Sequence, residues 1–97
     1  MTEAVCRERL AVLLKNNLID KIYVVGDKNS KGEFIKSAMT VVVDSKDRIK
    51  GLSLAKLQSE VESLLDTKVN LYELIELQLD DNLKEKLMKN KPLVIAR

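Results

Sequence analysis

The sequence of 97 residues contains no histidine, no tryptophan and a single cysteine, Cys6. Without histidine, neither a Ser-His-Asp nor a Cys-His catalytic centre can form. A lone cysteine excludes a disulfide framework, and the absence of histidine also excludes zinc sites built from Cys and His clusters. Any chemistry must therefore come from carboxylates, lysines, hydroxyls or backbone amides.

Aromatic residues make up 3% of the chain, and the net charge is only +2. Such a chain offers no stacking platform for single strands and no strong basic field, which argues against a dedicated nucleic-acid binder. No apolar run approaches the ~20 residues that span a bilayer, so no membrane association is expected. The charged N-terminus lacks the apolar core of a signal peptide. We expect a single cytoplasmic domain over residues 1–97, in a reducing compartment that suits an unpaired cysteine.

The sequence does contain alternating helical and strand periods. Apolar residues at helical spacing mark helices, and runs rich in β-branched residues mark strands. In chain order they predict a helix over residues 2–17, strands over 19–25 and 37–44, a helix over about 54–65, a strand from 68 to about 75, a helix capped by Asp80 or Asp81, and a strand over 93–96. Cys6, Met88, Tyr23 and Tyr72 are predicted to be packing residues.

These elements predict a mixed α/β (α+β) fold of order α-β-β-α-β-α-β. The first two strands are joined by a polar loop and suit an antiparallel pair, whereas a helix joins the second and third strands, as in a parallel crossover. The strand over 37–44 is apolar on both faces, which is typical of a central strand. We therefore expect a small mixed four-stranded sheet covered by about three helices.

The polar loop after the first strand is the first candidate site. Its residues Gly26, Asp27, Lys28, Ser30 and Lys31 combine a glycine at a strand end with small polar side chains and two lysines. Such a turn presents backbone N–H groups and positive charge to a phosphate. The Gly-Lys-Ser/Thr ending of a P-loop is absent, and a solvated surface loop remains the alternative.

A magnesium site is the second candidate. Phosphoryl transfer with Mg²⁺ needs two or three converging carboxylates, and on a strand these usually form Asp-x-Asp, because alternate residues share a face. The second strand instead carries Ala38-Met39-Thr40 at that position. Asp44 lies on the same face as Ala38 and Thr40, but about 13 Å beyond Thr40. It is therefore predicted to be a strand-end or turn residue.

Several motifs follow one another at the spacing of a known family. Val24-Val25-Gly26 ends the first strand, Ser37 follows eleven residues later, and Lys68-Val69-Asn70-Leu71 forms the third strand. Over nearly its whole length the chain resembles the minimal nucleotidyltransferase domains of the DNA polymerase β superfamily. Those domains have a Gly-Ser turn, then Ser-Asp-x-Asp on the second strand and a further Asp in a motif like Lys-Val-Asp-Leu.

The departures from the family pattern fall at the functional positions. Asp27 replaces the serine of the turn, Ser30 the loop arginine, Ala38 and Thr40 the paired aspartates, and Asn70 the aspartate of the third strand. The resemblance therefore implies the fold, and a nucleotide-binding turn that includes Ser37, but none of the three carboxylates that hold the metal.

The resemblance implies a catalytically degenerate domain, a pseudoenzyme rather than an enzyme, that acts by protein contact. The family pairs with helical HEPN-type proteins in toxin–antitoxin modules, so a HEPN-type protein is the expected partner. A homodimer through the edge strand Leu93–Ala96 is a variant. Two alternatives stay open: a metal-independent nucleotide sensor, and an enzyme whose metal site is rebuilt by Asp27 and Glu33. No cofactor is expected, because Mg²⁺ and a nucleotide are required only if the family activity survives.

Overall fold

The structure, a computed structural model, describes residues 1–89 and 91–96, and the side chains of all of these except Ser37, Lys86 and Met88. The predictions that Met88 packs in the core and that Ser37 contacts a nucleotide therefore lie outside the described side chains.

The elements follow the predicted order with two additions. They are α1 (Glu3–Leu10), the 3₁₀ helix η1 (Ala11–Lys15), β1 (Lys21–Lys28), β2 (Phe34–Asp44), α2 (Leu52–Leu65), β3 (Asn70–Glu73), α3 (Leu74–Gln78), α4 (Asp81–Met88) and β4 (Leu93–Ala96). The sheet has the order β3-β2-β1-β4. β1 is antiparallel to β2 and β4, and β2 is parallel to β3. The predicted fold class is confirmed, with α3 and η1 in addition.

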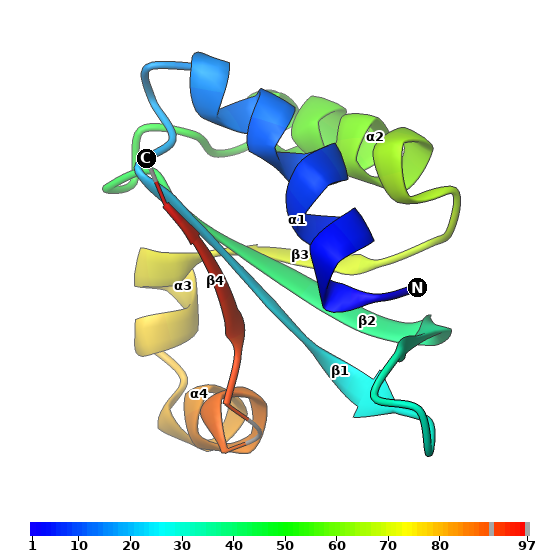
Figure 1. Ribbon diagram of the computed structural model, residues 1–97. Helices are drawn as coiled ribbons and strands as arrows, with labels where there is room; N and C mark the ends of the chain where they lie inside the picture. The colour runs from blue at the N-terminus through cyan, green and yellow to red at the C-terminus, as the bar shows by residue number, and fades with distance from the viewer. Residues whose placement is uncertain (90, 97) are drawn as a thin grey trace.

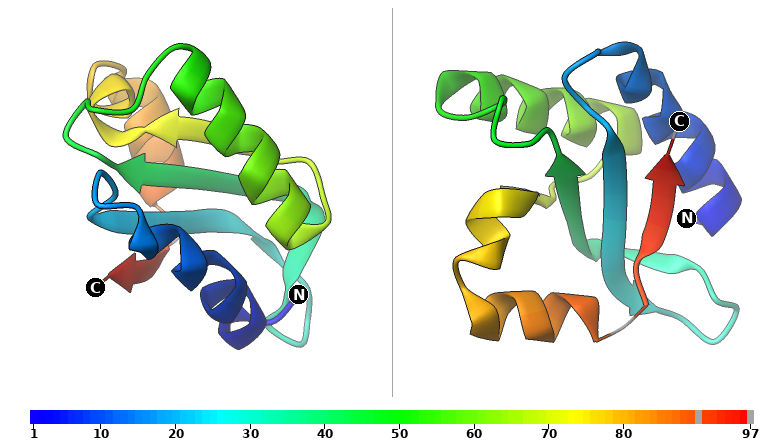
Figure 2. Two further views of the ribbon diagram at one scale, coloured as in Figure 1. Left: turned by 90° about the horizontal axis from the view of Figure 1, so that it is seen from above. Right: turned by 90° about the vertical axis from the view of Figure 1, so that its left-hand side faces the viewer.

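The sheet lies between two layers of helices. Figure 1 and Figure 2 show α1 and α2 on one face of the sheet, and α3 and α4 on the other. Val41 and Val43 of β2 belong to the core cluster between the sheet and the first helical layer, together with the buried Cys6. Val42 is also fully buried, and strand alternation places it on the opposite face. The prediction that β2 is a central strand, apolar on both faces, is therefore confirmed.

The segment between β1 and β2 is shorter and more regular than predicted. β1 continues to Lys28 and β2 begins at Phe34, so the two strands form a hairpin that takes in much of the expected loop. Asn29 sets the turn, because its Oδ1 accepts hydrogen bonds from the backbone N–H groups of Lys31 (2.9 Å) and Glu33 (3.0 Å). The side chain of an asparagine commonly closes a turn in this way.

The predicted strand from 68 to about 75 is wrong in extent. The strand β3 covers only Asn70–Glu73, and the chain continues directly into the short helix α3. The side chain of Glu73 accepts a hydrogen bond from the N–H of Ile75 and thereby caps α3. This capping contact is invisible to the periodicity of the sequence, in which the run to Ile75 is equally compatible with a strand.

Candidate functional site

The three positions at which the family pattern has aspartates come together on one face of the sheet. Thr40 of β2 and Asn70 of β3 are partners in the parallel register, and Ala38 lies two residues before Thr40. The neighbours Met39 and Leu71 pack in the core beneath α1 and α2. Strand alternation therefore places Ala38, Thr40 and Asn70 on the opposite face, the one that α3 and α4 partly cover.

At these three positions the side chains are the methyl group of Ala38, the hydroxyl of Thr40 and the amide of Asn70. Mg²⁺ binds hard, preferably charged oxygen ligands, and a neutral hydroxyl and amide are weak ligands without a carboxylate partner. Within residues 1–89 and 91–96, no group of three or more His, Cys, Asp or Glu side chains is placed to hold a metal ion. The arrangement can therefore bind a polar group but offers no charge that compensates a divalent cation.

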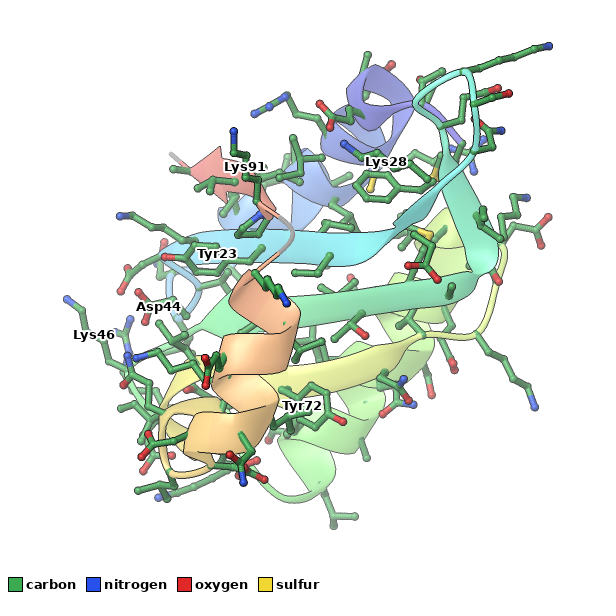
Figure 3. All side chains as sticks on the ribbon, turned by 90° about the horizontal axis from the view of Figure 1, so that it is seen from below. Tyr23, Lys28, Asp44, Lys46, Tyr72 and Lys91 are labelled. Carbon is green, nitrogen blue, oxygen red and sulfur yellow. The ribbon has the colours of Figure 1, made fainter. Side chains whose placement is uncertain are left out.

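Asp44 lies at the far end of β2 from this triplet. It pairs in register with Lys21, and its Oδ1 accepts a hydrogen bond from the backbone N–H of Lys46 (3.3 Å). Figure 3 shows Asp44 beside Tyr23 and Lys46, away from the end of β2 at which Ala38 lies. The prediction that Asp44 is a strand-end residue is confirmed.

The backbone amide groups at the tip of the β1–β2 hairpin form hydrogen bonds within the turn itself. Besides the two bonds to Oδ1, the N–H of Gly32 donates to the carbonyl of Asn29 (3.0 Å), and the N–H of Asn29 donates to the carbonyl of Glu33 (2.9 Å). Ser30 is an exposed residue within this turn. The amides of Lys31, Gly32 and Glu33 thus close the loop, and they are not free for a phosphate.

A bulge lies between that tip and the regular part of the hairpin. Gly26 pairs with Met39 but Lys28 pairs with Phe34, so Asp27 alone opposes residues 35–38 of β2. Phe34 and Met39, five residues apart, are both buried in the same core, which a regular strand would not allow. Bulges of this kind re-aim side chains and are common next to functional sites. Gly26 itself is still in the regular register, with the backbone of Ala38 beside it.

Glycine is required at position 26 by this close approach. A Cβ atom there would lie 2.7 Å from the carbonyl oxygen of Ala38, closer than real Cβ contacts come. Glycine at this position therefore lets the backbones of β1 and β2 approach closely where the first candidate segment begins.

An open cavity of about 510 Å³ lies at this end of β1 and is lined by Gly26, Asp27, Lys28, Lys89 and Lys91. It brings three of the predicted turn residues together with two lysines of the connection between α4 and β4. The pairing of Val24 with Leu93 explains the meeting, because in an antiparallel pair the residues before Leu93 lie beside those after Val24. The proximity of Lys89 and Lys91 to the end of β1 is predictable only if the pairing of β4 with β1 is known.

Lys28, which lines the cavity, already has interaction partners. Its ammonium group pairs with the carboxylate of Glu3 and lies 5.0 Å from the centre of the Phe34 ring. The single cysteine takes no part in the site, because burial raises the pKa of the Cys6 thiol to about 11, where it is a poor nucleophile at neutral pH.

Comparisons of the chain with protein-family models, with curated proteins and with solved structures find no match. None of the helices in the described part of the chain has both the length and the apolar character that crossing a membrane requires. The function is therefore argued from the residues and their geometry.

Proposed function

We propose that the protein is a nucleotidyltransferase-like domain without transferase activity, which works by binding another protein. One observation carries this proposal. The register pairs Thr40 with Asn70 and places Ala38 on the same face, so three positions converge where a metal centre would need acids, and all three are neutral.

The loss of these acids removes the main source of catalysis in phosphoryl transfer. The reaction depends on positioning and on neutralising the charge of the transferred group, and metal ions supply most of that neutralisation. The nearby cations are lysines that line a cavity at the end of β1. Lysines attract phosphate, but they do not activate the attacking hydroxyl.

A metal site rebuilt from Asp27 and Glu33 is less well supported. Asp27 lies in the bulge and lines the lysine-rich cavity, whereas Glu33 belongs to the hairpin turn that Asn29 closes. Two acids on a hairpin lack the converging third ligand that holds Mg²⁺ in its octahedral geometry.

The helix α3 supports contact with a protein. It buries Leu77 at 1% exposure but leaves Ile75 exposed at 36%, and its C-cap residue Leu79, four residues further along, is exposed at 84%. Neighbouring exposed apolar side chains on one helix face are a feature of interaction surfaces. A helical protein of the HEPN type, the expected partner, would cover them.

The edge of the sheet favours such a partner over a second copy of the chain. A homodimer through β4 would need the outer hydrogen-bonding groups of that strand. The guanidinium of Arg7 already donates to the carbonyl of Val94 (2.9 Å) and so protects the edge.

The test is co-expression with helical proteins of the HEPN type, followed by purification and measurement of the molar mass of any complex. We expect a complex that Leu79→Asp weakens at least about tenfold, because a charge enters an apolar contact. The matched control is Leu52→Asp, since Leu52 is equally exposed (83%) but lies on α2 in the other helical layer.

Two results would overturn the proposal. One is a chain that stays monomeric with every helical candidate. The other is transfer of labelled nucleotide by the purified chain in the presence of Mg²⁺.

A further inference from the structure

The cavity at the end of β1 has the size of a small-molecule site. Its volume of about 510 Å³ falls within the ~300–1,000 Å³ range of ligand pockets. Two segments far apart in the sequence form it, the bulged end of β1 and the connection between α4 and β4. The proposed protein contact on α3 makes no use of it.

The charges around this cavity are unbalanced. Three of its lining residues are lysines, and Asp27 is the only acid among them. Lys28 pairs with Glu3, but Lys89 and Lys91 take part in none of the ion pairs of the described residues. Lysine side chains that line one cavity with few counter-charges create a local potential that attracts an anion.

The backbone around the cavity supports a ligand as well. The bulge in the β1–β2 hairpin leaves Asp27, which lines the cavity, without a register partner on β2. Lys91 has a φ of 45°, a left-handed conformation that is unfavourable for a residue other than glycine. Strained residues of this kind cluster at binding sites, where they aim a side chain. Figure 3 shows Lys28 and Lys91 from the side of the molecule on which α4 lies.

We propose that this cavity binds a phosphate-bearing anion without a metal ion. Lys89 and Lys91 contact the phosphate oxygens, and Lys28 forms the wall. Pyrophosphate and the phosphate chain of a nucleotide offer the same oxygens. The site is independent of the protein contact, so either proposal can fail while the other holds.

The test is an amide NMR titration of the full chain at low salt in the presence of a chelator, with pyrophosphate, tripolyphosphate and ATP as separate probes. We expect shifts centred on Gly26, Asp27, Lys28, Lys89 and Lys91, and weaker binding as salt is added. The double variant Lys89→Gln/Lys91→Gln should weaken binding by about tenfold or more. The matched control, Lys84→Gln, changes an exposed lysine of α4 that does not line the cavity.

The three probes distinguish the sources of the phosphate. Tighter binding of ATP than of tripolyphosphate would assign the site to a nucleotide, and equal binding would assign it to the polyphosphate alone. The absence of shifts with all three probes at millimolar concentration would overturn the proposal. Equal affinities of the double variant and the native chain would also overturn it. Lys89 and Lys91 would then only stabilise the negative C-terminal end of the α4 dipole and bind no anion.

Discussion

At the scale of single residues, Glu73 is the side chain on which the arrangement of β2 and β3 depends most. It is fully buried, and its carboxylate accepts hydrogen bonds from the hydroxyl and N–H of Ser45 and from the N–H groups of Asp47 (3.0 Å) and Ile75 (2.6 Å). Burial raises the pKa of Glu73, but the bonds from Ser45, Ile75 and Asp47 outweigh it and hold the pKa below its ordinary value of 4.5. One carboxylate thus joins the turn after β2 to the end of β3.

The substitution Glu73→Gln should lower the free energy of unfolding by about 2–4 kcal/mol at neutral pH, because an amide replaces a charged acceptor of several buried donors. The carboxylate is more acidic in the folded chain, so its stabilising effect is present above its ordinary pKa. The effect disappears as the pH falls through the lower, folded pKa.

Denaturant unfolding of the native chain, of Glu73→Gln and of the control Glu76→Gln at a series of pH values measures this difference. Glu76 is exposed on α3, the helix that Glu73 caps, and its substitution should change little. A gap between native chain and Glu73→Gln that stays constant from neutral to strongly acidic pH would contradict the assigned role.

At the scale of the elements, the hairpin between β1 and β2 depends on one asparagine. Asn29 forms two side-chain and two backbone hydrogen bonds within the turn. A turn closed in this way is rigid at its tip, so its lysine and serine side chains are displayed on a fixed loop. The bulge then begins where this turn ends, and the two features together position the end of β1.

The substitution Asn29→Ala should destabilise the hairpin by about 1 kcal/mol, because the N–H groups of Lys31 and Glu33 lose their acceptor. Hydrogen exchange of these two amides should become faster, whereas exchange in α2 should be unchanged. Ser30→Ala is the control from the same turn. Equal exchange rates in both variants would show that the asparagine does not set the turn.

The elements also show where prediction from the sequence succeeds and where it fails. β4 is predicted with the observed bounds, because Pro92 cannot continue the preceding helix and Val94 and Ile95 are β-branched. α3 is missed, because its start depends on Glu73 and on contacts of that side chain with Ser45, distant in the sequence. The bulge at Asp27 is missed for a similar reason, since a register shift is a property of two strands and not of one.

At the scale of the whole molecule, the sheet order decides what the site contains. The parallel pairing of β2 with β3 gathers the neutral triplet Ala38, Thr40 and Asn70. The pairing of β1 with β4 brings Lys89 and Lys91 to the end of β1. The residues of the triplet were predictable from the family resemblance, but the two lysines were not, because nothing in a single sequence indicates that β4 adds beside β1.

The central claim is that the triplet holds no metal ion, so that the domain acts by binding alone. Paramagnetic Mn²⁺ added to the isotope-labelled chain tests this claim most directly, because it broadens the amide signals of residues close to a bound ion. A variant with Ala38→Asp, Thr40→Asp and Asn70→Asp serves as the positive control, since it restores three converging carboxylates.

We predict that Mn²⁺ selectively broadens the amide signals of residues 40 and 70 in the variant, and neither signal in the native chain. Selective broadening of Thr40 and Asn70 in the native chain at micromolar Mn²⁺ would contradict the claim.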